Sequence, residues 1–493
     1  MKRLIFASLI IFSWAGAGLA QPMEITMDAY LLKVRQSHPF FRKEALTVDV
    51  ERQAQERLTG EEDWVLSAAP SYTHIEPSRA GGFNPRRIDQ MGVSLGASRY
   101  FWGAGSTLSV DYGYTHTNLK VDDISIPLPT GPIAMPNDGG VFQENSLTVT
   151  YRQPLIQNRG GFLSRLAHTL QGFNVDASEL IARENQEDYL LRAGGMFIDW
   201  ALLTEQRKIS MTRLALAEEE LGRTQEKRKH NLVDEVDMIR AKDAVIGARQ
   251  GIRLLETALE GVEAELMALA SLNPELKLAP RFDLYAPASD ILPLPRSLEL
   301  LDQRSRLLKT LDVRLEQVAQ SQQGAQEMEM PRMDAVLQAG VKGGDKDFGQ
   351  AAAMDKPQAM AALVFSYPLG NRAARAEIAR AALAREKLAE ERNNIRLELQ
   401  TSIKGVLARI YALEQTLALD RGRIKTSEEK TAAELKRYEQ GRTELTFVIL
   451  SRDAEEAARL AHAQDSASYQ KLALAYRALM DALAPEMEEE PKP

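Results

Sequence analysis

The sequence repeats itself, and this repetition limits the folds that the chain can adopt. The segments VTYRQPLIQNRGG (149–161) and LVFSYPLGNRAA (363–374) both carry an alternating apolar run, then Pro-Leu, then Asn-Arg. Their prolines, Pro154 and Pro368, lie 214 residues apart. Residues 230–241 match 440–451, and the stretch from Thr26 resembles that from Ser297. Three matches in one order predict a tandem duplication.

Long helices fill most of each half. Apolar residues recur at spacings of three and four in 252–269 and in 399–417, which is typical of helices packed as coiled coils. We predict antiparallel helical hairpins over 162–271 and 371–484, with outgoing helices roughly 100 Å long. Asn231 and Gly441 follow the two outgoing helices at matching positions, and both residue types tolerate the left-handed backbone of a turn.

Four segments alternate in hydrophobicity and are predicted to be strands: 64–75, 144–153, 333–342 and 358–367. Alternation over about ten residues with aromatic ends is typical of a membrane β-barrel, although a soluble sandwich would show it too. Four strands cannot close a barrel, and an open sheet would leave backbone groups unpaired in lipid. A barrel would therefore need other copies of the chain.

The N-terminus and the composition indicate export. Lys2 and Arg3 precede an apolar run that ends in small residues at Ala20, so 1–20 is predicted to be a secretory signal peptide. The chain has no cysteine for disulfides or for lipid attachment, and no long apolar run follows the signal. A formal net charge of −8 without a basic patch argues against nucleic-acid binding.

The sequence lacks the usual patterns of catalysis. Its six histidines are scattered without an HExxH motif, and no phosphate-binding loop or nucleophile elbow is present. We therefore expect no enzyme activity, no cofactor and no metal site.

The duplicated order, the Pro-Leu…Asn-Arg junctions and the RYEQG turn (437–441) resemble the TolC family of outer-membrane factors. The resemblance implies a mainly α fold with membrane β-strands: a homotrimer whose 12-stranded barrel, four strands per chain, lies in outer-membrane lipid above a periplasmic coiled-coil tunnel. It also implies a passive exit duct of a tripartite efflux pump or a type I secretion system, with a periplasmic adaptor and an inner-membrane pump of the RND or ABC type as partners. The alternative is a periplasmic coiled-coil adaptor, which would carry one hairpin and a lipoyl-like domain.

This comparison sets the expected domains. The first repeat covers 21–271 and begins with a helix over 26–60. A connector over 272–296, the equatorial region, leads to the second repeat over 297–484, which begins with a helix over 297–329. An acidic periplasmic tail covers 485–493.

The first repeat is longer because of an insertion over 76–143. It contains a further alternating pair of segments within 91–117, joined by WGAGS, and a Pro/Gly-rich loop. We expect an added extracellular hairpin on the outer rim. The alternative places both strands in the barrel wall, which would give 18 strands in a trimer.

By the same resemblance, Gly441 lies at the periplasmic tip of the second hairpin. Phe447 and Leu450 stand six and nine residues beyond it, where relatives often carry acidic residues, and Asp237 matches Phe447 in the first hairpin. We hypothesise that Phe447 and Leu450 form an apolar gate that closes by dewetting, with Asp237 beside it. The alternative is that both apolar residues only pack the hairpin.

The residues expected at the tip turns and in adaptor docking are Asn231, Asp234, Tyr438, Gly441 and Arg442. An ion pair of Arg442 with Asp234 or Asp237 is one hypothesis for holding the tip, although an exposed pair contributes only about 0–1 kcal/mol.

Overall fold

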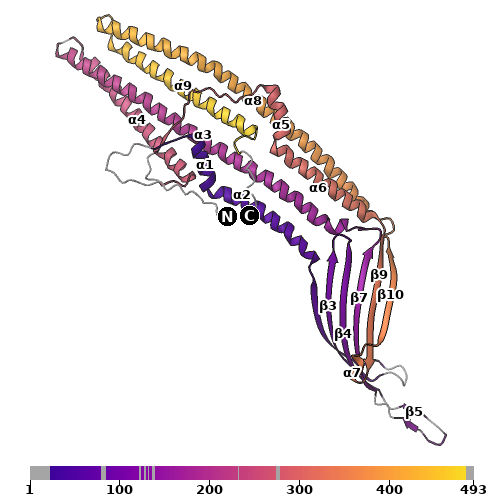
Figure 1. The fold of residues 1–493 in the computed structure, drawn as a ribbon. Helices are drawn as coiled ribbons and strands as arrows, with labels where there is room; N and C mark the ends of the chain where they lie inside the picture. Colours follow the sequence, from indigo (N-terminus) through magenta and orange to yellow (C-terminus); the bar gives the residue numbers. More distant parts are fainter. Residues whose placement is uncertain are drawn as a thin grey trace, which may run out of the picture. The chain divides into compact units, whose positions relative to one another are not determined.

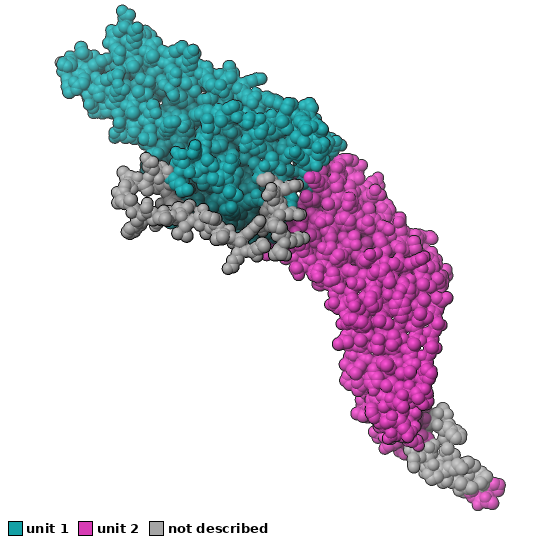
Figure 2. All heavy atoms as spheres, in the orientation of Figure 1, with its two compact units in different colours: residues 1–45, 182–306, 396–493 teal, residues 46–181, 307–395 magenta. Residues whose placement is uncertain are grey.

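The computed structural model describes residues 23–78, 85–121, 124–126, 129–131, 133–135, 139–230, 232–273 and 278–484. The predicted signal peptide, the acidic tail and Asn231 lie outside these ranges. The chain divides into two compact units (Figure 2). Unit 1 comprises Met1–Ala45, Ala182–Arg306 and Arg396–Pro493, and unit 2 comprises Leu46–Ile181 and Leu307–Ile395. Each unit takes segments from both predicted repeats.

Helices account for most of the described chain (Figure 1). They are α1 (Met27–Ser37), α2 (Pro39–Thr59), α3 (Phe162–Lys229), α4 (Glu235–Leu269), α5 (Leu294–Arg304), α6 (Arg306–Glu329), α7 (Phe348–Ala351), α8 (Arg372–Glu439) and α9 (Leu445–Leu479), with a 3-10 turn at Gly60–Glu62. The outgoing helices α3 and α8 have 68 residues each, and the returning helices α4 and α9 have 35 each. A duplicated unit would have this equality of lengths.

The helices predicted over 26–60 and 297–329 are each two helices in the structure. The first breaks at His38, which is extended because Pro39 disfavours helical backbone at the preceding residue. The second breaks at Ser305, which has ψ 118°. The N–H of Arg306 donates to Asp481 Oδ2 at 2.8 Å, so the new helix begins with a bond from a side chain.

The core of unit 1 lies between its helices. One cluster joins Tyr30 of α1 to Phe197 and Trp200 of α3 and to Leu266 of α4. Another joins apolar residues of α8, among them Ile403 and Ile410, to Tyr469 and Tyr476 of α9. The 3/4-spaced residues of the sequence therefore face other helices. No helix in the described part of the chain is both long enough and apolar enough to cross a membrane.

Unit 2 contains a six-stranded antiparallel sheet in the order β10-β9-β7-β4-β3-β2. Its strands are β2 (Val65–Ile75), β3 (Arg87–Phe101), β4 (Ser106–Lys120), β7 (Gly140–Pro154), β9 (Arg332–Asp345) and β10 (Lys356–Ser366). Two small pairs lie outside it: β1 (Met23–Ile25) with β8 (Leu278–Pro280), and β5 (Ile124–Ile126) with β6 (Ile133–Met135).

The inserted strands β3 and β4 lie inside the sheet, which therefore has six strands in this chain and not the four that were predicted. β3 pairs with β2 along the full length of β2, and β4 pairs with β7 from Thr107↔Arg152 to Leu119↔Gly140. The turn between them is anchored: Trp102 is buried, and its backbone N–H donates to Glu62 Oε1 at 2.8 Å. Gln153 Nε2 donates to the Ala104 carbonyl at 3.0 Å. The alternation of the insertion allowed it to continue the sheet.

The strand register separates the side chains into two faces. One face, the apolar face, carries large exposed hydrophobic residues across the sheet: Leu66, Met91, Val93, Leu95, Leu147, Val149, Leu337, Leu363 and Phe365. The opposite face, the polar face, is rich in serine, threonine and glycine on β3, β4 and β7, and it carries the Lys342–Glu144 ion pair. Exposed apolar surface of this extent is unusual for a protein that functions alone in water.

The two Pro-Leu motifs mark the junctions from strand to outgoing helix. Pro154 ends β7, and four residues later Asn158 has φ 62° shortly before α3. Pro368 follows β10, and Asn371, with φ 37°, directly precedes α8. Asn371 Nδ2 also donates to the Glu329 carbonyl of α6 at 3.0 Å. Each motif thus has a left-handed asparagine; Asn371 ends its loop, whereas Gly160 and Gly161, with φ 74° and 71°, follow Asn158 before α3 begins.

Candidate functional site at the tips of the helical hairpins

Both hairpins of unit 1 reverse direction through the same hydrogen bond. The N–H of Arg442 donates to the Arg437 carbonyl at 2.9 Å, and the N–H of Leu232 donates to the Lys227 carbonyl at 2.9 Å. Gly441 has φ 69°, a conformation that glycine adopts without strain. Asp234 and Glu444 are the residues that precede α4 and α9, and neither side chain caps its helix.

A small apolar cluster lies directly behind the second turn. Tyr438 of α8, Leu445 and Val448 of α9 and Ala241 of α4 are buried together. The ammonium of Lys227, at the end of α3, lies 3.6 Å from the centre of the Tyr438 ring. Burial lowers the pKa of Lys227. The cluster therefore joins the two hairpins near their tips, and Tyr438 is one of its members.

Phe447 and Leu450 lie on the other side of α9 from this cluster. Their side chains are 52% and 58% exposed, whereas Val448 is fully buried. The chain's own hairpins therefore leave about half of the surface of each residue uncovered. Leu450 lines a cleft of about 390 Å³ between α4 and α9, together with small residues such as Gly247.

The acidic residue assigned to the gate, Asp237, is mostly buried at the start of α4. Its carboxylate lies 3.4 Å from Arg240 Nη1, and Arg240 also lies 3.8 Å from Glu444 of the second hairpin. Asp237 thus pairs with Arg240 rather than with Arg442. Among the described residues, the hypothesised pair of Arg442 with Asp234 does not occur either. Arg240 therefore joins the start of α4 to the residue that precedes α9.

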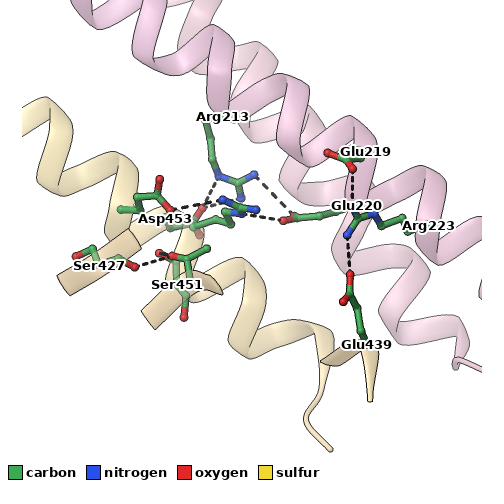
Figure 3. Close-up of polar contacts among 11 residues, drawn as sticks. Arg213, Glu219, Glu220, Arg223, Ser427, Glu439, Ser451 and Asp453 are labelled. Atoms are coloured by element: carbon green, nitrogen blue, oxygen red, sulfur yellow. Dashed lines mark hydrogen bonds and ion pairs between the residues drawn. The ribbon is translucent and has the colours of Figure 1, made fainter. Parts of the chain in front are cut away.

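A network of charged residues lies further along the hairpins, between α3 and α9 (Figure 3). Arg213 of α3 donates to Asp453 Oδ1 of α9 through Nε at 3.1 Å and through Nη2 at 2.8 Å. Arg452 Nε of α9 donates to Glu220 Oε1 of α3 at 3.4 Å. Arg213 and Glu220 have side chains only 5% and 7% exposed. We call these four residues the α3–α9 charge network.

Burial leaves part of the α3–α9 charge network without hydrogen bonds. Burial raises the pKa of Glu220, while the charges of Arg213 and Arg452 oppose that rise. Arg213 Nη1 and Glu220 Oε2 are buried without a hydrogen bond and lie 4.0 Å apart. On the exposed side, Arg223 of α3 pairs with Glu439 of α8 at 3.3 Å, which adds a weaker contact between the hairpins (Figure 3).

The α3–α9 charge network was not identified from the sequence, although a signal was present. Arg213, Ala217, Glu220 and Thr224 recur at spacings of four, three and four, and all are buried. Charged residues at such positions of a heptad seam set the register between helices. Charged residues are usually found on the solvated face of a helix, so this spacing alone does not identify a buried network.

A second group of buried charges lies among α3, α6 and the end of α9, within unit 1. Arg306 is bonded to Glu187 and lies 3.6 Å from Asp481. The nearby carboxyl of Glu184 has a pKa raised to about 7, first by burial and then by the charge of Asp481. Across the described ranges, no group of three or more His, Asp or Glu residues is arranged to hold a metal ion.

Comparison with known proteins gives matches in structure and none in sequence. The sequence matches no protein-family model and no curated protein. The CusC channel superimposes with a TM-score of 0.68 at 11% identity, over 95% of each chain, in a study of transmembrane channel formation. The outer membrane protein VceC of Vibrio cholerae gives 0.61 at 13% identity, over 93% of this chain and 96% of that one.

The open MtrE outer membrane channel of Neisseria gonorrhoeae gives a TM-score of 0.62 at 13% identity, over 93% of this chain and 89% of that one. These likenesses cover the helices and strands of both units. The chain therefore has the fold of the TolC-type outer-membrane channels, as its paired motifs predicted.

Proposed function

We propose that this protein is an outer-membrane channel that serves as the passive exit duct of a tripartite efflux pump or a type I secretion system. The observation that carries the proposal is the six-stranded sheet, which has one apolar and one polar face and two unpaired edges. Such a sheet is stable in lipid only if its edges are paired, so it must close with other copies around a polar lumen.

Three copies are proposed from the resemblance to the family. The likeness to outer-membrane channels over more than nine tenths of the chain supports this assignment. A periplasmic adaptor explains the structure less well, because an adaptor has no use for an apolar sheet face. The duct itself needs no catalytic group, so energy would come from an inner-membrane pump, which a periplasmic adaptor would connect to the tips.

Localisation and conductance test this proposal together. The full chain should fractionate with the outer membrane, run as a trimer that dissociates on heating, and form pores in planar bilayers. A protein that purifies as a monomer without detergent would contradict it.

At the tips, the proposal assigns gating to Phe447 and Leu450, with Asp237 nearby. Their exposure within one chain leaves them free to meet the same residues of other copies and to exclude water from a narrow pore. The turns around Asn231, Asp234, Tyr438, Gly441 and Arg442 are proposed to contact the adaptor.

The combined change Phe447→Ala/Leu450→Ala tests the gate. We expect a higher conductance in the closed state, because an apolar ring that loses its large side chains rewets. The matched control is Leu254→Ala, which truncates another exposed leucine, on α4. A closed-state conductance equal to that of the unaltered channel would remove the gate proposal and leave the channel proposal intact.

A further inference from the structure

The width of the barrel follows from the position of the inserted hairpin. Resting on the proposed trimeric channel, we infer that β3 and β4 are part of the membrane wall, so that three copies close an 18-stranded barrel through pairing of β2 with β10 of the next copy.

The inserted strands have the same two faces as the rest of the sheet. Across the β3–β4 ladder, Leu95 pairs with Tyr112 and Val93 with Tyr114, all on the apolar face. Between them along β3, Ser94 points to the polar face, opposite Gly113. A hairpin standing in water above the membrane would expose this apolar surface to solvent. The alternation suits a wall with lipid on one side.

The two inserted strands also run along almost the full length of the neighbouring strands. The turn between them lies at the helix end, where the Trp102 ring is 5.4 Å from the ring of His168 of α3. Added bulk at Gly161, just before α3, would collide with the Trp102 carbonyl, so the turn is fitted closely against the strand-to-helix junction. Strands fixed at this end cannot at the same time form a rim at the other.

The helices next to the sheet give an independent measure of its width. Contacts join α2 to α3 (Gln171 to Glu51), α3 to α6 (Gln317 to Asn174) and α6 to α8 (Arg392 to Asp312). The helices therefore form a single layer in the order α2-α3-α6-α8, which follows the order of the strands that they continue (Figure 1).

The width of the helical layer can be compared with the width of the sheet. Four helices at about 8–10 Å between axes cover an arc of about 32–40 Å. Six strands at about 4.8 Å spacing and about 40° tilt cover roughly 38 Å, whereas four strands cover only about 25 Å. The six-stranded sheet therefore matches its helical layer.

The two edges of the sheet are suited to each other. β2 and β10 each have 11 residues, and both are exposed along almost their whole length. With six antiparallel strands, β2 and β10 run in opposite directions, so an antiparallel ladder between copies is allowed. Their apolar-face residues, such as Leu66 and Leu363, would continue one surface across the joint. The occupant of each edge is a second copy of this chain.

An 18-stranded ring would be roughly 36 Å across its backbone, against about 24 Å for 12 strands, which about doubles the cross-section of the mouth. Electron cryomicroscopy of the full-length trimer in lipid nanodiscs tests this directly. We expect 18 wall strands, with β3 and β4 between β2 and β7. A trimer with 12 wall strands would overturn the inference and leave the proposed function standing, whereas a soluble monomer would overturn both.

A pair of substitutions gives a second test. Leu95→Arg places a charge on the apolar face and should reduce the trimer recovered from outer membranes by about tenfold or more, since arginine in the lipid-facing wall is strongly disfavoured. The adjacent change Ser94→Arg places the same charge on the polar face and should leave recovery within about twofold. Equal effects of the two changes would contradict a place in the wall.

Discussion

The sheet and the hairpin tips use apolar and charged residues in opposite ways. In the sheet, large apolar side chains form a continuous exposed face, and the charges lie mainly on the other face or near the strand ends. Near the tips, Arg213 and Glu220 are buried between α3 and α9, while exposed apolar residues such as Val236 and Phe447 alternate with charged ones along α4 and α9. In the proposed channel, the continuous apolar face would contact lipid. Exposed apolar residues that alternate with charged ones are suited to local contacts instead.

The largest loss of stability is expected on replacing a buried charge of the α3–α9 charge network. Arg213→Met leaves Glu220 buried with a single counterion, so the free energy of unfolding of the helical region should fall by about 3–5 kcal/mol. Arg223→Met is the matched control, since this exposed α3 arginine contributes only about 0–1 kcal/mol. Chemical unfolding followed by circular dichroism measures both. Similar values for the two variants would mean that burial of the network contributes nothing.

In the sheet, the effect of an added charge should depend on the face. Leu147→Lys on β7 should destabilise the membrane-inserted protein by about 2–4 kcal/mol, and the neighbouring Thr148→Lys on the polar face should cost far less. Unfolding of the lipid-reconstituted protein gives the two values. Equal destabilisation by the two substitutions would mean that the two faces do not lie in different environments.

The buried charges also predict a dependence on pH. The pKa of Glu184 is raised to about 7, so the folded chain binds this proton more tightly than the unfolded chain. Stability should therefore decrease as the pH rises through the interval from about 4.5 to 7, and it should be constant above that interval.

Because Glu184 is only half-buried, removing its charge should raise stability at pH 8 by about 1–2 kcal/mol. Unfolding of Glu184→Gln at pH 5 and pH 8 checks this, with Glu218→Gln, an exposed α3 carboxylate, as the control. A gain of the same size at both pH values would show that ionisation of Glu184 is not the cause.

The smallest effect is expected at the tip turn. Gly441→Ala places a Cβ on a residue with φ 69° and should destabilise the hairpin by about 1 kcal/mol. Gly405→Ala, inside α8 with open space around its Cα, should be neutral or slightly stabilising. Thermal unfolding distinguishes the two, and a neutral Gly441→Ala would show that another residue sets the turn.

The long helices and the strand-to-helix junctions could be predicted from the sequence because their signals are local. The 3/4 spacing of Ile403 and Ile410 and the asparagine of each Pro-Leu junction determine nearby backbone. The count of strands in the sheet was missed, since alternation shows that β3 and β4 are strands but does not show which strands they pair with. The α3–α9 charge network was missed for a similar reason, as Arg213 and Asp453 are partners only after two distant helices pack.

The even number of strands has a consequence for assembly. Since each copy presents strands of opposite direction at its two edges, a ring of any number of copies would satisfy the hydrogen bonds of the wall. Strand pairing alone therefore does not determine how many copies form the ring. In the proposed assembly, the number of copies would then be set by the angle at which helices of adjacent copies meet, while the strands would close the wall whatever that number is.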